Sequence, residues 1–149
     1  MKVLQKINLV WGGIVTVLSA IFGDFWFLFL AFLLLNVADY VTGILKARFT
    51  KTENSNKGLR GIVKKVGYWV VIAIAFFIAL CFDEMGGLIG VNLSFVELLG
   101  WFTLATFIIN EIRSILENLV IIGVDVPVFL IKGLEVAYDA VQAKTEVNK

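Results

Sequence analysis

The sequence VGYWVVIAIAFFIALCF, residues 66–82, contains no charged side chain. An uncharged apolar stretch of this kind is typical of a helix that crosses a bilayer, where each backbone polar group must bond within its own segment. Its flanks differ in charge: residues 46–65 carry seven basic side chains and one acidic one, whereas residues 83–97 carry three acidic side chains and no basic one. Lys and Arg in short loops are retained on the cytoplasmic side during insertion. The asymmetry therefore predicts a membrane protein whose basic segment faces the cytoplasm.

The composition also indicates a membrane protein. Hydrophobic residues make up 60 % of the 149-residue chain and charged residues 17 %, whereas soluble domains average roughly 45–50 % and about 25 %. The net charge of +1 argues against nucleic acid as a partner, because phosphate binding needs a clustered excess of base. The chain has no histidine, and its single cysteine, Cys81, lies inside the apolar stretch. This inventory excludes histidine-based acid–base catalysis and common zinc sites, so we expect neither an enzyme nor a cofactor.

Three further stretches are predicted to span the membrane. Residues 7–23 and 25–45 are apolar and are separated by Asp24, which marks a turn. Residues 98–110 are too few to cross a bilayer alone, but helical periodicity continues beyond them, so this span is predicted at residues 98–123. A cleaved signal peptide is the alternative for residues 7–23. We favour a span, because the small-residue cleavage pattern there is poor.

Four spans return the chain to its starting side, so both termini and the basic segment are predicted to be cytoplasmic. We expect residues 46–65 to form a loop and residues 83–92 to form a short flexible connection. Pro127 begins a new element. Residues 127–149 have the helical spacing of an amphipathic helix, on the membrane surface or against a neighbouring subunit, with a short tail. The predicted fold class is an all-α membrane protein, with four transmembrane helices in residues 1–126 plus a C-terminal amphipathic helix.

Asp39 lies deep in the second predicted span, where a carboxyl group costs at least roughly 2.5 kcal/mol. We therefore expect it to face protein or water and to have a partner. Helical spacing places Asn36, Thr42, Gly43 and Lys46 on the same side, and the glycine allows a close backbone approach. This side is predicted to be a seam between helices. The sequence leaves open whether Asp39 is a hydrogen-bonded packing residue or acts in conduction or gating.

The fourth predicted span carries a polar stripe along one face. Such a stripe either packs into a helix bundle or lines a water-filled path, and we favour packing. Arg113 has two candidate partners: Glu117, one turn along its own helix, or Asp39 on the second span. We favour Glu117, because a local partner needs no assumed helix order. The stripe consists of Thr103, Thr106, Asn110, Glu111, Arg113, Ser114, Glu117 and Asn118.

Three ordered blocks of residues resemble a known family. Residues 39–47 read D-x-x-T-G-I-x-K-A, a polar turn then runs into the third span, and residues 110–118 read N-E-x-x-S-I-x-E-N. The pattern is completed by Gly58, Gly61, Lys64, Lys65, Gly123 and Pro127. The ordered set, which is more specific than any one block, resembles the phage-lysis and toxin-secretion holin family. That family includes holins of phages of Gram-positive bacteria and clostridial toxin-release holins.

The resemblance implies a small multi-pass protein of the bacterial cytoplasmic (inner) membrane that forms homo-oligomers in the lipid bilayer. At a set time, the oligomers open lesions that release a cell-wall hydrolase or a toxin. The muralytic enzyme or toxin is then a functional partner without direct binding being implied. The candidate residues for oligomerisation or pore lining are the polar stripe of the fourth span together with Asn36, Asp39, Thr42 and Gly43.

Two other classes of membrane protein remain as alternatives. A small transporter or ion-channel subunit would need a substrate site near the midplane, but the third span has neither a charge nor a broken helix to supply one. A structural subunit of a larger membrane complex is the other alternative. Lysis of the expressing cell separates a holin from both.

Overall fold

The computed structural model describes residues 2–146, which form helices and turns without a strand. Two short 3₁₀ helices, η1 (Gly23–Phe25) and η2 (Ser94–Val96), lie between longer α-helices. The α-helices are α1 (Lys2–Phe22), α2 (Trp26–Phe49), α3 (Ser55–Ile89), α4 (Glu97–Ile121) and α5 (Val128–Glu146). The helices α1 to α4 are each long and apolar enough to cross a membrane. The prediction of four membrane-capable helices is therefore confirmed.

The first compact unit ends at Ala31 and contains α1, η1 and the start of α2. The apolar side chains of α1 are mostly exposed, as is usual for a helix surrounded by lipid. Gly23 takes a φ of +60°, a left-handed conformation that glycine adopts at little cost, and so allows the turn at η1. Phe22 and Phe29 stack across this turn with ring centroids 4.4 Å apart. The turn predicted at Asp24 is confirmed.

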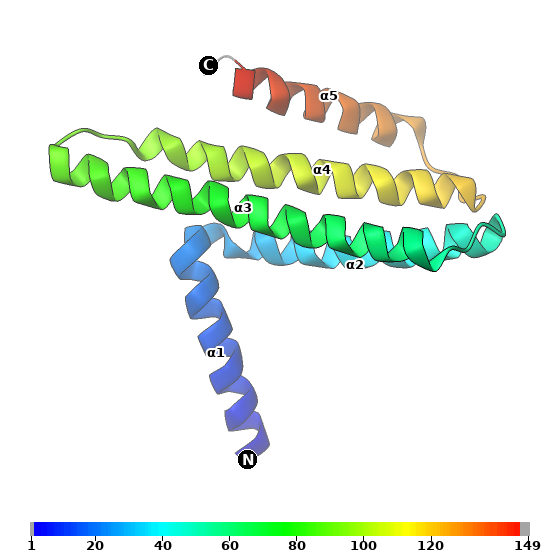
Figure 1. The fold of residues 1–149 in the computed structure, drawn as a ribbon, viewed down its shortest axis with the longest axis horizontal. Helices are drawn as coiled ribbons and strands as arrows, with labels where there is room; N and C mark the ends of the chain where they lie inside the picture. The colour runs from blue at the N-terminus through cyan, green and yellow to red at the C-terminus, as the bar shows by residue number, and fades with distance from the viewer. Residues whose placement is uncertain (1, 147–149) are drawn as a thin grey trace. The chain divides into compact units, whose positions relative to one another are not determined.

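The second compact unit begins at Phe32 and contains the rest of α2 with α3, α4 and α5. The chain runs up and down: α3 and α4 form an antiparallel pair, and α5 returns along α4 (Figure 1). Buried residues recur every seven positions: Ile72, Ala79 and Gly86 on α3, and Leu104, Glu111 and Asn118 on α4. A seven-residue repeat keeps one face of each helix toward its partner, as in coiled coils.

The apolar part of this core lies where α3 and α4 approach most closely. A Cβ atom added to Gly100 would lie 2.8 Å from the ring of Phe76, so the glycine is required by the close approach. The same ring meets Trp101 edge-on, with centroids 4.9 Å apart. Phe32 on α2 and Leu104 on α4 are almost fully buried. Small residues against aromatic rings thus hold these helices together without polar contacts.

The third helix is longer than predicted. Residues 46–65 were expected to form a loop, but only residues 50–54 lie outside α2 and α3. The side chain of Asn54 caps α3 by accepting bonds from the backbone N–H groups of Asn56 and Lys57, at 2.9 and 3.3 Å. The turn-rich composition therefore marks a helix start and not a long loop. At the other end, the predicted flexible connection is helical as far as Ile89.

The C-terminal helix α5 begins directly after Pro127, as predicted, and the backbone N–H of Leu130 donates to the carbonyl of Pro127. It packs along α4 of its own chain. Its amphipathic role and its cytoplasmic location stay predictions, as do the domain boundary after residue 126 and the signal-peptide alternative. Residues 147–149 of the predicted tail lie outside the described part of the chain.

Candidate functional site

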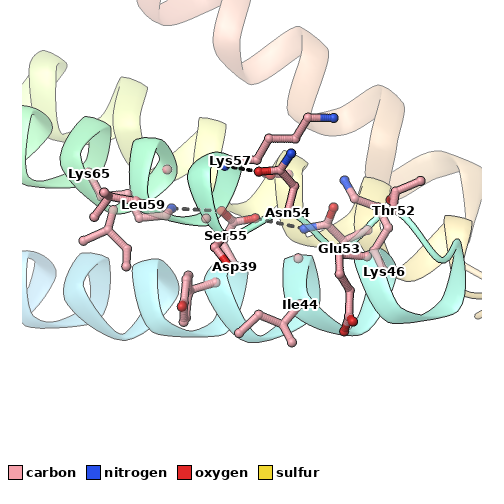
Figure 2. Close-up of a pocket in the computed structure, with 18 residues that line it drawn as sticks. Asp39, Ile44, Lys46, Thr52, Glu53, Asn54, Ser55, Lys57, Leu59 and Lys65 are labelled. Atoms are coloured by element: carbon pink, nitrogen blue, oxygen red, sulfur yellow. Dashed lines mark hydrogen bonds and ion pairs between the residues drawn. The ribbon is translucent and has the colours of Figure 1, made fainter.

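An ion cluster joins three helices of the second unit. The ammonium group of Lys65 on α3 lies 2.9 Å from the carboxylate of Asp39 on α2 and also bonds to Glu111 on α4. The three side chains are 14 %, 15 % and 4 % exposed, respectively. Figure 2 shows Asp39 and Lys65 joined by their ion pair between α2 and α3. The partner expected for Asp39 is therefore present.

The cluster joins α2, α3 and α4 through one shared ammonium group. Two carboxylates share one ammonium group, so the removal of the lysine leaves two acidic groups in a largely dry seam. Removing one partner of a buried ion pair costs about 3–5 kcal/mol, because the remaining charge is uncompensated. Lys65 thus stabilises the arrangement of α2 and α4 through its ion pairs from α3.

Asn118 on α4 adds two hydrogen bonds between α4 and α2 beside the ion cluster. Its side-chain amide donates to the carboxylate of Asp39 at 3.1 Å and to the hydroxyl of Thr42 at 3.2 Å. The hydroxyl of Thr42 in turn donates to the backbone carbonyl of Asp39 at 3.1 Å. We call Asp39, Lys65, Glu111 and Asn118 the polar cluster. It is a hydrogen-bonded seam of the kind predicted for this side of α2.

Two other predicted residues of α2 have smaller roles in this seam. Asn36 is 4 % exposed, and its amide donates to the carbonyl of Phe32 at 2.7 Å. A Cβ atom added to Gly43 would lie 3.9 Å from the amide nitrogen of Asn118, an ordinary contact. The close backbone approach expected at Gly43 is therefore not present within this chain. Gly100 on α4 is instead a glycine packed closely against another helix, at the ring of Phe76.

The predicted stripe on α4 divides into parts with different surroundings. Glu111 and Asn118 are buried in the polar cluster. Thr103 and Thr106 donate their hydroxyls to carbonyls one turn earlier, at 2.7 and 2.8 Å, so those groups are satisfied by their own helix. The two remaining half-buried members are Asn110 and Ser114. The stripe is therefore not one continuous polar surface.

Arg113 and Glu117 form a separate, exposed ion pair on α4. Their side chains lie 2.9 Å apart and are 54 % and 57 % exposed, so the predicted pairing within one helix is confirmed. The alternative bond to Asp39 is not formed, because Lys65 takes that position. Across a small cavity, α5 presents Glu135 and Tyr138 toward Arg113. We call Arg113 and Glu117 the outer pair.

The sequence interpretation placed Lys65 in the family pattern but not among the candidate site residues, because it was assigned to the basic loop as a topological charge. The seven-residue spacing of Lys65 from the buried residues of α3 indicates that it faces inward. Lys65 lies seven residues before Ile72 and fourteen before Ala79, both of which are buried on α3. Extending the apolar heptad of the third span backwards by one repeat places this lysine on the inward face. The adjacent Lys64 points elsewhere and lies 5.7 Å from the ring centroid of Tyr68.

A cavity of about 910 Å³ opens beside the polar cluster, between α2 and the first turns of α3 (Figure 2). Asp39, Lys65 and Asn118 line its inner end, and the turn of residues 50–54 contributes to the opposite end. Among the described residues, no group of three or more histidine, cysteine or acidic side chains could hold a metal ion.

Comparison with known proteins identifies the family. The model of the bacteriophage holin family matches residues 16–139, most of the chain. The chain belongs to this family. A protein of Bacillus phage phi105 named "Probable holin" is 32 % identical over 126 residues, which cover 85 % of this chain and 84 % of the phage protein. The matched range includes the whole polar cluster.

This holin-family protein is also similar to proteins of bacteria. An uncharacterized protein of Listeria innocua is 32 % identical over 140 residues, covering 94 % of this chain and 90 % of the relative. An uncharacterized protein of Clostridium perfringens is 34 % identical and covers 87 % of both chains. No solved structure matches. Family membership and the four membrane-capable helices indicate a multi-pass membrane protein that is not an enzyme.

Proposed function

We propose that this protein is a holin that oligomerises in the bacterial cytoplasmic membrane and forms lesions, through which a cell-wall hydrolase or a toxin leaves the cell. The family match over residues 16–139 carries the proposal. Similarity to a phage protein named as a holin supports the same role. The charge asymmetry around the third span supports an orientation with both termini and the α2–α3 turn in the cytoplasm.

The polar residues suggest which surfaces assemble. The polar cluster is used inside one chain, so it holds the subunit together and leaves the outer pair for contacts between subunits. Charged side chains at membrane depth are expensive when they face lipid. The exposed Arg113 and Glu117 would therefore face water or a neighbouring subunit once oligomers form. Polar contacts between helices in lipid contribute roughly 0.6–2 kcal/mol each.

Co-expression with a cytoplasmic muralytic enzyme tests the proposal. A holin should cause abrupt lysis after a delay when the enzyme is present, because the lesions let the enzyme reach the wall. The enzyme alone should leave the wall intact, and so should the holin alone. A transporter or channel subunit would instead give a saturable, substrate-dependent flux without lysis. Membrane insertion at high level without release of the enzyme would overturn the holin assignment.

A further inference from the structure

The cavity between α2 and α3 has a polar mouth and an apolar rim. Its mouth is formed by the α2–α3 turn, with Lys46 from α2 and Lys57 from α3. In Figure 2, Lys46 and Thr52 lie near this turn, away from Lys65 at the other end. The predicted orientation places the mouth at the cytoplasmic boundary of the membrane. The cavity therefore opens where lipid headgroups lie.

The acidic residues that line the cavity already have cationic partners. Glu53 pairs with Arg48 at 3.2 Å, and Asp39 pairs with Lys65 at the inner end. Within the described residues 2–146, the ammonium groups of Lys46 and Lys57 have no ion-pair partner. The uncompensated charge at the mouth is therefore positive, and it is complementary to a phosphate ester.

The rim of the cavity is apolar and exposed. Tyr40 and Ile44 on α2 are 41 % and 36 % exposed, and Leu59 and Ile62 on α3 are 61 % and 42 % exposed. In a bilayer, these side chains would contact acyl chains just below the headgroups. A ligand that fits both parts has an anionic phosphate next to a long apolar chain. A soluble phosphate compound would use only the lysines.

We propose that this cavity binds the headgroup of an anionic phospholipid in the leaflet that the α2–α3 turn faces. Lys46 and Lys57 bind the phosphate, and the apolar rim contacts the upper part of the acyl chains. Basic pockets between membrane helices bind anionic headgroups in this way. The polar cluster closes the inner end, so the phosphate stays at the mouth. This site goes beyond the proposed function and requires only that the protein is inserted in a membrane.

The experiment compares two double variants with equal loss of charge. Lys46→Gln with Lys57→Gln removes both ammonium groups of the mouth, whereas Lys51→Gln with Arg60→Gln removes two basic groups of the same region that do not line the cavity. Native mass spectrometry of the full-length protein in detergent measures binding of phosphatidylglycerol and of phosphatidylcholine with the same chains. Circular dichroism checks that each variant keeps its helices, and Lys46→Arg with Lys57→Arg tests whether charge restores binding.

We expect the wild type to prefer phosphatidylglycerol and the first variant to bind it roughly thirtyfold more weakly, if each lysine contributes as basic residues near anionic headgroups do. The Lys51/Arg60 variant and the arginine variant should bind like the wild type, and free glycerol phosphate should not displace the lipid. Equal losses in both glutamine variants would indicate diffuse attraction and overturn the site. So would an absent headgroup preference, an unaffected first variant or displacement by glycerol phosphate. Because binding is measured on purified protein, these results do not depend on lysis.

Discussion

Asn118 on α4 donates its side-chain amide to the carboxylate of Asp39 on α2 at 3.1 Å, across 79 residues of sequence. The two residues belong to the first and third blocks of the family pattern, so this bond brings both blocks to one place. Lys65, from the polar turn between them, lies on the other side of Asp39. The three blocks of the pattern therefore describe one polar cluster that holds α2, α3 and α4 together.

Replacing Lys65 by methionine should destabilise the protein strongly. The change leaves the carboxylates of Asp39 and Glu111 without their shared cation, and an uncompensated buried charge costs about 3–5 kcal/mol. Thermal unfolding in detergent, followed by circular dichroism, measures the loss. The control is Lys64→Met, which removes the adjacent but exposed lysine. Similar unfolding temperatures for the two variants would contradict the role given to the polar cluster.

Gly100→Ala should weaken the packing of α3 against α4. The added methyl group would lie 2.8 Å from the buried ring of Phe76, and overpacking of this kind costs about 1–3 kcal/mol. The matched control is Gly43→Ala, whose methyl group would lie 3.9 Å from its nearest neighbour, an ordinary contact. The same unfolding assay should show a loss for the first variant and little change for the second. The opposite order would contradict the helix packing described above.

The sequence predicted the helices better than it predicted their lengths. Apolar periodicity located α1, α2 and α4 closely, because lipid and core both select the same uncharged runs. It missed both ends of α3, where Asn54 acts as a cap and Gly86 and Gly87 lie inside the helix. Composition alone does not distinguish a glycine that ends a helix from one that packs within it.

The contacts of the candidate site that lie within one helix were predicted from the sequence, and those between helices were not. The Arg113–Glu117 pair needs only helical spacing, so the sequence was sufficient. The bond from Asn118 to Asp39 depends on which helices are neighbours, which one sequence does not specify. Lys65 was not among the candidate site residues, because a lysine beside a basic turn resembles a topological signal. Only the heptad of the buried face distinguishes it from Lys64.

Single-cysteine labelling should confirm the predicted orientation. Cys81, the native thiol, is first replaced by serine, and cysteine is then introduced at Asn54 in the α2–α3 turn or at Gly87 near the end of α3. A membrane-impermeant reagent added to intact cells should label position 87 and not position 54, because basic loops stay in the cytoplasm. Permeabilised cells should label both. Labelling of position 54 in intact cells would show that the α2–α3 turn lies outside the cell and would contradict the predicted orientation.

Replacing both members of the outer pair by leucine should change the oligomers without changing the net charge. Arg113 and Glu117 are exposed on α4, so in lipid they favour contacts with water or a neighbouring subunit. Crosslinking in membranes, followed by gel electrophoresis, should show a shifted distribution of oligomer sizes. The control replaces Arg48 and Glu53, a somewhat more exposed ion pair near the turn, by leucine. Identical crosslinking patterns for the wild type and both variants would remove the outer pair from the interface.

Asp39→Leu should change the delay before lysis in cells that also express a muralytic enzyme. The substitution removes an acceptor of Lys65 and of Asn118, so α2 loses its ion pair to α3 and one of its two hydrogen bonds from Asn118 on α4. Asp39→Asn is the comparison, because it keeps a side chain of the same shape that can still accept from Asn118 but lacks the charge. If the polar cluster sets when subunits rearrange into a lesion, leucine should shift the delay more than asparagine, at equal protein levels on immunoblots. If both variants lyse cells after the same delay as the wild type, the polar cluster does not determine the time of lysis. That result would leave the holin assignment in place.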